Sequence, residues 1–132
     1  MPDFYFEYDA EHMVLAVRVT GAFTDAVMLA CYQAMAGQLG RREVRAAFLD
    51  LSAAGSVDVS ADAVRGMSKL APLFPDPLPK YIVAAEDHIF GMARMFQITS
   101  QGRETLQVVR SRQDVYASLG LGTARFERLD IA

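Results

Sequence analysis

Two aspartates, Asp50 and Asp58, flank a turn in the middle of the chain and could bind a cation or receive another ligand. A metal site needs several ligands that converge on one point. The two histidines, His12 and His88, have no ligand spacing, and Cys31 is the only cysteine. We therefore expect no metal ion and no cofactor. The simpler interpretation is that Asp58 helps to cap a helix, while Asp50 is solvated or bonded to backbone groups.

Three serines in the same stretch, Ser52, Ser56 and Ser60, are candidate nucleophiles if a histidine base lies nearby. His88 follows a predicted strand and falls on the same end of the sheet. However, the chain has no G-x-S-x-G motif and no glycine-rich phosphate-binding motif. These serines are typical of polar turns and helix caps, and we predict that Ser60 caps a helix with Asp62 in its first turn. We do not expect an enzyme.

The most distinctive stretch runs from Phe90 to Phe96 and reads FGMARMF. In a helix, Met92 and Phe96 share one face and are expected to be core, whereas Phe90 and Arg94 lie on the opposite face. A helix that is apolar on more than one side is buried on both sides. Since one sheet covers only one stripe, we predict a homodimer with Phe90 or Arg94, or the C-terminal tail, at the contact.

An alternative cover for this helix is the segment from Pro72 to Pro79, which holds four of the five prolines. Proline fixes the backbone φ angle, so this segment is predicted to be a stiff loop. Its apolar residues Leu73, Phe74 and Leu78 are expected to pack on the domain and not to extend into solvent.

Alternating apolar and amphipathic runs predict the elements that position these residues. Runs at 4–8 and 13–20 predict an antiparallel hairpin whose first strand lies at the sheet edge. The other elements alternate strictly: helix 24–39, strand 44–51, helix 61–70, strand 80–85, helix 89–99, strand 106–110 and a short helix after Ser111. This order predicts one α/β domain over 1–132, with four helices and a mixed, mostly parallel sheet of about five strands. The tail from 123 to 132 either pairs as a last strand or lies across a partner.

The first of these helices should present an apolar face to the core. Five residues follow helical spacing from i to i+11: Met28, Cys31, Tyr32, Met35 and Leu39. Thr24 is the expected cap at its start. A buried cysteine on such a face behaves as a small apolar group.

Composition argues against several partners. The net charge is -3 and the pI is about 5.3, with no basic run, so nucleic acid is not an expected partner. The longest apolar stretches fall far below the roughly 18 residues of a membrane span. The N-terminus lacks the regions of a signal peptide, and a single cysteine allows no internal disulfide. These absences favour the cytoplasm.

The element order and two motifs together resemble the STAS superfamily, whose SpoIIAA-like fold is that of the anti-sigma factor antagonists. One motif is Leu49-Asp50-Leu51-Ser52 leading to Val57-Asp58-Val59-Ser60, which is similar to the strand–loop–helix signature of the family. The other is the stretch from Phe90 to Phe96. The likeness covers nearly the whole chain and implies the SpoIIAA-like fold.

Residue by residue, Asp58 matches the aspartate of the family signature. Val59 stands where the family has a phosphorylatable serine or threonine, and Ser60 is shifted by one position. The resemblance therefore implies the fold and a role in binding partner proteins, and in some branches small molecules or lipids, without implying the phosphorylation site.

Three functional hypotheses follow. The first is a non-catalytic STAS-like regulatory or protein-interaction module that forms a homodimer and binds a regulatory protein. Its partner or ligand surface would include Asp58, Ser60, Phe90 and Arg94. The second is a small-molecule or lipid-binding protein with an apolar pocket between the helices at 61–70 and 89–99. The third, and least favoured, is an unrecognised hydrolase.

Overall fold

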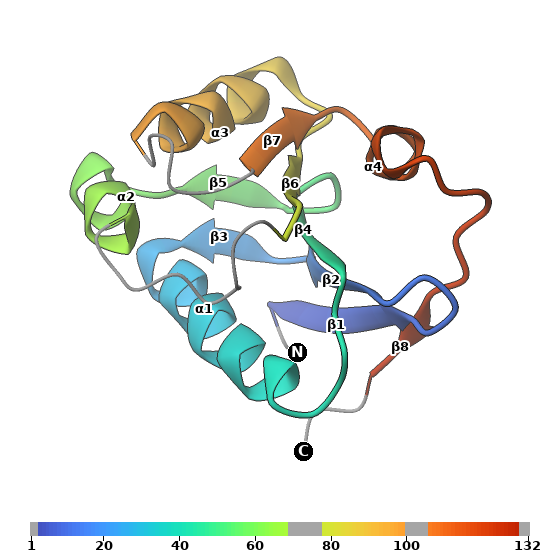
Figure 1. The fold of residues 1–132 in the computed structure, drawn as a ribbon. Coiled ribbons are helices and arrows are strands. Elements are labelled where there is room, and N and C mark those ends of the chain that lie inside the picture. The colour runs from blue at the N-terminus through green and yellow to red at the C-terminus, as the bar shows by residue number, and fades with distance from the viewer. Residues whose placement is uncertain (1–2, 69–77, 100–105, 130–132) are drawn as a thin grey trace.

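A mixed β-sheet forms the centre of the computed structural model, which describes residues 3–68, 78–99 and 106–129 (Figure 1). The strands are β1 (Phe4–Asp9), β2 (Val14–Val19), β3 (Ala22–Thr24), β4 (Ala46–Asp50), β5 (Ser56–Asp58), β6 (Lys80–Val83), β7 (Leu106–Val109) and β8 (Glu127–Arg128). The helices are α1 (Asp25–Leu39), α2 (Ala61–Ser68), α3 (Asp87–Thr99) and α4 (Arg112–Leu119).

The main sheet has six strands in the order β7-β6-β4-β2-β1-β8. Strands β2, β4, β6 and β7 pair in parallel, and β1 pairs with β2 antiparallel as a hairpin. Strands β3 and β5 form a separate two-stranded parallel sheet. The predicted α/β fold, with four helices and a mostly parallel sheet, is therefore confirmed over the described residues.

Two features of the sheets differ from the prediction. Strand β1 is not an edge strand, because Glu7 and Tyr8 pair with Arg128 and Glu127 of β8. The tail thus adds a sixth strand where about five were expected. Strands β3 and β5 were not predicted, because three residues are too few to display the alternation by which a strand is recognised.

Alternation along the strands gives the main sheet two buried faces. On β4, Ala47 and Leu49 pack with residues of α1 and α3, whereas Ala46 and Phe48 pack with residues of α4. Figure 1 shows the same division, with α1, α2 and α3 together and α4 apart from them. We call the first the three-helix face and the second the α4 face.

Short-range hydrogen bonds explain where the helices begin and end. Thr24, Ser60 and Ser111 each accept a bond from the backbone N–H three residues on, at 3.3, 3.0 and 3.2 Å respectively. These side chains satisfy N–H groups that have no partner within the helix. Gly120 ends α4 in the left-handed conformation, with φ of 70°, which glycine adopts without strain. The predicted caps at Thr24 and Ser60 are confirmed.

The predicted proline-rich loop falls mostly outside the described residues. The packing of Leu73 and Phe74 therefore stays a prediction. Leu78, where the description resumes, is half-buried and packs against the core of the three-helix face, as expected. Among the helices of the described ranges, none has the length and apolar character needed to cross a membrane.

Candidate functional site: an apolar cavity

A cavity of about 220 Å³ lies between the three-helix face of the sheet and helices α1, α2 and α3. Strand residues such as Val17, Leu49 and Ile82 form its floor, and the loop before α2 contributes Val59. Nearly all of the described wall is aliphatic, aromatic or sulfur-containing. A concave, apolar space under a layer of helices is the usual form of a small-molecule site.

Helix α1 supplies one wall of the cavity through Met28, Cys31, Tyr32 and Met35. These residues lie on the apolar face that their spacing predicts. Burial raises the pKa of the Cys31 thiol to about 12, with a smaller contribution from the negative charge of Asp3. The thiol is therefore protonated at neutral pH and serves as an apolar wall group and not as a nucleophile.

Helices α2 and α3 supply the opposite wall, with Met67 from α2 and Met92 and Ala93 from α3. Met92 therefore points inward, as predicted, but it borders a cavity. The side chain of Phe96 lies outside the described part of the chain, so its place in the core stays a prediction. Methionine side chains are flexible and polarisable, so such a wall can adapt to ligands of different shape.

The predicted surface residues Asp58 and Ser60 lie near this site without lining it. Ser60 donates its backbone N–H and its hydroxyl to the carboxylate of Asp25, at 2.7 and 2.9 Å. Asp58 is an exposed residue of β5, opposite Thr24, so Ser60 and not Asp58 caps α2. The Asp25 contact could not be predicted from the sequence, because it joins residues 35 positions apart.

The other two predicted surface residues, Phe90 and Arg94, lie on α3 and differ in their exposure to solvent. The guanidinium of Arg110 covers the ring of Phe90 at 4.0 Å and pairs with Asp87 at 2.7 Å. Phe90 is half-buried and packs against the core of the three-helix face. Arg94 is exposed, and its neighbour Met95 is 64% exposed. Met95 is therefore the more accessible apolar residue of this helix.

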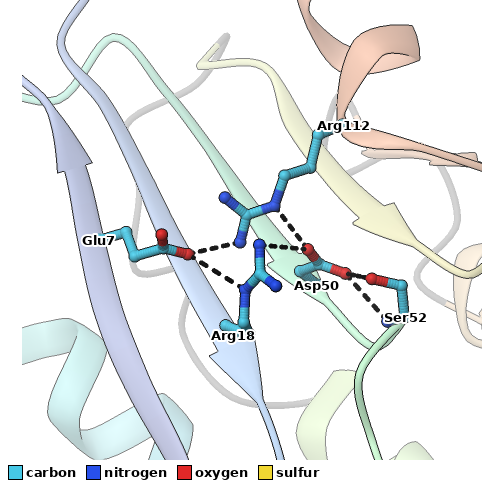
Figure 2. A network of polar contacts seen from close by, with 5 residues as sticks. All are labelled: Glu7, Arg18, Asp50, Ser52 and Arg112. Atoms are coloured by element: carbon cyan, nitrogen blue, oxygen red, sulfur yellow. Dashed lines mark hydrogen bonds and ion pairs between the residues drawn. The ribbon is translucent and has the colours of Figure 1, made fainter. Parts of the chain in front are cut away.

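A second candidate site, which is polar, lies on the α4 face and joins four charged residues (Figure 2). The guanidinium of Arg112 donates to Asp50 at 2.6 Å and to Glu7 at 2.5 Å. Arg18 donates to Glu7 at 3.3 Å and lies 3.8 Å from Asp50. Two acids and two bases balance in charge, and the network ties the first turn of α4 to β1, β2 and β4. We interpret it as a structural clamp.

Asp50 is fully buried in this network, so of the two expected arrangements, solvated or bonded to backbone groups, it adopts the second. The backbone N–H and the hydroxyl of Ser52 donate to it, which confirms the expected backbone bond. Burial alone would raise the pKa of Asp50, but the bonds from Ser52 and Arg112 outweigh burial and lower it. Burial likewise opposes the charge of Arg112, and the bonds to Glu7 and Asp50 raise its pKa. Asp50 and Arg112 therefore stay charged at neutral pH.

The β1–β2 turn gathers three possible metal ligands that the sequence analysis missed. One ligand atom from each of Asp9, Glu11 and His12 lies within 4.8 Å of the others. Asp9 is fully buried and already accepts bonds from the Tyr116 hydroxyl at 2.6 Å and from the His12 ring at 2.8 Å. Its other oxygen accepts two backbone N–H groups of the turn. The carboxylate thus holds the hairpin and α4 together.

Two of the three serines that the hydrolase hypothesis considers, Ser52 and Ser60, have other partners. The hydroxyls of Ser52 and Ser60 donate to the carboxylates of Asp50 and Asp25. His88 is exposed in the first turn of α3, and over residues 3–68, 78–99 and 106–129 no serine hydroxyl is hydrogen-bonded to a histidine. The geometry of the described residues therefore gives no support to a serine nucleophile.

No protein-family model matches this chain, and no curated protein matches it.

Proposed function

We propose that this protein is a non-catalytic binding protein that holds a small apolar molecule in the cavity between α1, α2, α3 and the sheet. The observation that carries the proposal is the cavity itself, about 220 Å³ and almost wholly apolar over its described wall. An apolar wall without a paired acid and base favours binding over catalysis.

The apolar wall gives the proposal an energetic basis. Moving apolar surface from water into contact with an apolar ligand is favourable by about 25 cal/mol per Å². A ligand that fills the space of about 220 Å³ would cover wall residues such as Val17, Leu49 and Ile82, which is the thermodynamic reason to expect an occupant.

Native mass spectrometry of the freshly purified protein tests the proposal. We expect an adduct that dissociates on mild activation and that extraction identifies as a small apolar molecule. The variant Ala93→Leu places extra carbon atoms in the cavity wall and should lose the adduct. The matched control is Ala117→Leu, an exposed position on α4, which should keep it. Wild-type protein with no adduct, and with no thermal stabilisation by added apolar compounds, would contradict the proposal.

A second candidate function is the STAS-like regulatory or interaction module, acting as a homodimer. It is supported by the exposed pair Arg94 and Met95 on α3, since a large exposed apolar side chain beside a cation suits a protein contact. Asp58 and Ser60 would extend this surface along the loop before α2. Light scattering decides: a 14.5 kDa monomer at micromolar concentration, with or without Met95→Glu, would remove the homodimer from this candidate.

A further inference from the structure

The outer face of helix α1 carries no charged side chain, and Figure 1 shows this helix along the outside of the fold. The face consists of the exposed residues of the helix after Asp25, which are Ala26, Leu29, Ala30, Gln33, Ala36 and Gly37. A surface helix ordinarily presents charged residues to water. The other three helices do so over their described residues, for example with Asp62 of α2, Arg94 of α3 and Asp114 of α4. The outer face of α1 is therefore suited to burial against a partner.

Two residues give this face a projection and a space to receive one. Leu29 is 46% exposed, and on the described surface Met95 is the other large apolar side chain that stands out in this way. Gly37 lies about two turns further along the helix. Apart from its own helix backbone, no atom lies within 4 Å of the point where a Cβ on Gly37 would stand. In close helix packing, a large side chain of one helix fits over a small residue of the other.

The order of residues along the face makes it complementary to itself. Gln33 lies at its centre, midway between Asp25 at the start of α1 and Arg41 just past the end. An antiparallel second copy, related by a two-fold axis at Gln33, places Leu29 of each copy at the level of Gly37 of the other. It also brings Asp25 of each copy to the level of Arg41 of the other. A glutamine amide both donates and accepts, so the two Gln33 side chains can bond to each other.

The charges at the two ends of α1 favour the same orientation. The start of the helix is acidic, with Asp25 in its first turn and Asp58 opposite Thr24. The turn after the helix carries one acid and three bases, Glu43, Arg41, Arg42 and Arg45. An antiparallel pair sets the acidic end of one helix against the basic end of the other. A parallel pair would bring like charges together, which is unfavourable.

We propose that a second copy of this chain docks on the outer face of α1, and that the two α1 helices pack antiparallel about a two-fold axis at Gln33. A contact of this kind uses the same surface of both copies. The inference goes beyond ligand binding and does not depend on it, although α1 turns Met28 and Met35 on its other side toward the cavity. It leaves Arg94 and Met95 of α3 to a different partner.

Substitution of Gln33 tests the pairing, because only on the two-fold axis does a residue meet its own copy. A single helix face makes a small interface, so we expect wild type to change from a monomer to a dimer between about 1 and 300 µM in sedimentation velocity. Gln33→Glu and Gln33→Lys should each weaken this association at least about tenfold through like-charge repulsion. An equimolar mixture of the two variants should dimerise again. Gln113→Glu and Gln113→Lys, at an exposed position on α4, are the matched controls and should associate as wild type does.

Disulfide formation tests the orientation of the two helices. The Cα atoms of a disulfide lie within about 7 Å of each other. Gln33→Cys should therefore form a disulfide-linked dimer on mild oxidation. Ala26→Cys should not, because the two copies of this residue would lie about 21 Å apart along the helix axes, from a rise of 1.5 Å per residue. Cys31 is buried and should not compete.

Three kinds of result would overturn the inference. One is a wild-type monomer at the highest concentration. Another is a dimer that Gln33→Glu leaves intact, and loss of that dimer in Met95→Glu would place the contact on α3. The third is a mixture of the two Gln33 variants that stays monomeric, or equal disulfide yields from Gln33→Cys and Ala26→Cys, either of which would exclude the antiparallel arrangement. None of these results bears on ligand binding in the cavity.

Discussion

Replacing Ala47 by valine is expected to stabilise the protein, whereas the same replacement of Ala46 is expected to destabilise it. These neighbours in β4 are each 2% exposed. Ala47 lines the cavity, but Ala46 packs in the core of the α4 face. Because strand, exposure and substitution are the same, strand propensity and effects on the unfolded chain largely cancel between the two variants.

The magnitude follows from the two surroundings. Valine adds two carbon atoms, and burying each in open apolar space contributes about 0.8 kcal/mol, so Ala47→Val gains up to about 1.6 kcal/mol. At Ala46 the added atoms must displace close-packed neighbours, which costs about 1–3 kcal/mol. The unfolding free energies of the two variants should therefore differ by roughly 1 to 4.5 kcal/mol, with opposite signs relative to wild type.

Urea unfolding followed by circular dichroism measures both free energies on one scale. The slopes of the unfolding transitions should match the wild-type slope, so that a shift in midpoint reports stability. A loss of stability in Ala47→Val comparable to that in Ala46→Val would refute the reasoning. It would mean that Ala47 is as tightly packed as its neighbour and that the cavity is filled by the protein.

Four further predictions concern single groups. Ser60→Ala should lower the unfolding free energy by about 1 kcal/mol, because α2 loses its cap; Ser60→Asp, which places a carboxylate beside Asp25, should lower it further, and an unchanged value for both would contradict the assigned role. Arg112→Met should cost about 3–5 kcal/mol, because the Asp50 carboxylate stays buried without its main cation. The lowered pKa of Asp50 means that its contribution to the free energy of unfolding is present above its ordinary pKa of 3.8 and is lost as the pH falls through the lower folded pKa. Asp50→Asn should therefore weaken the dependence of stability on pH in acid. Identical acid profiles for the variant and the wild type would be evidence against this reasoning. Cys31, with a pKa of about 12, should react with thiol reagents at pH 8 only as fast as the protein opens, and rapid labelling of the native protein would contradict its burial.

Features that depend on neighbouring residues could be predicted from the sequence. The caps at Thr24 and Ser60 follow from a hydroxyl placed just before an amphipathic run. The face of α1 that carries Met28 and Cys31 follows from helical spacing alone. Strict alternation of apolar strands and amphipathic helices was enough for the fold class.

Features that join distant residues could not be predicted in this way. Glu7 and Arg112 are 105 positions apart, and nothing in either neighbourhood indicates the other. The pairing of β8 with β1 joins equally distant parts of the chain. The sequence therefore did not decide whether the tail pairs as a last strand or lies across a partner. Asp50 shows both cases. Its position before a turn could be predicted from the sequence, but its burial between two arginines could not.

The cavity belongs to a third kind of feature. Periodicity indicates which face of an element a residue occupies, but it carries no information on whether the facing elements fill the space between them. Met92 and Ala93 therefore looked like ordinary core residues. Lys80 begins a predicted strand, and its burial could not be predicted from the sequence, because it depends on neighbours in β4 and β7.

The methionine methyl groups offer the most direct test of apolar-ligand binding. Met28, Met35, Met67 and Met92 line the cavity, whereas Met13 and Met95 are not among its described wall residues and serve as internal controls. In protein labelled with ¹³C at the methionine methyl groups, titration with octan-1-ol should move the four cavity signals along one saturable curve and leave the two controls in place. Cavity signals that do not move, or a shift of Met95 as large as theirs, would contradict the account.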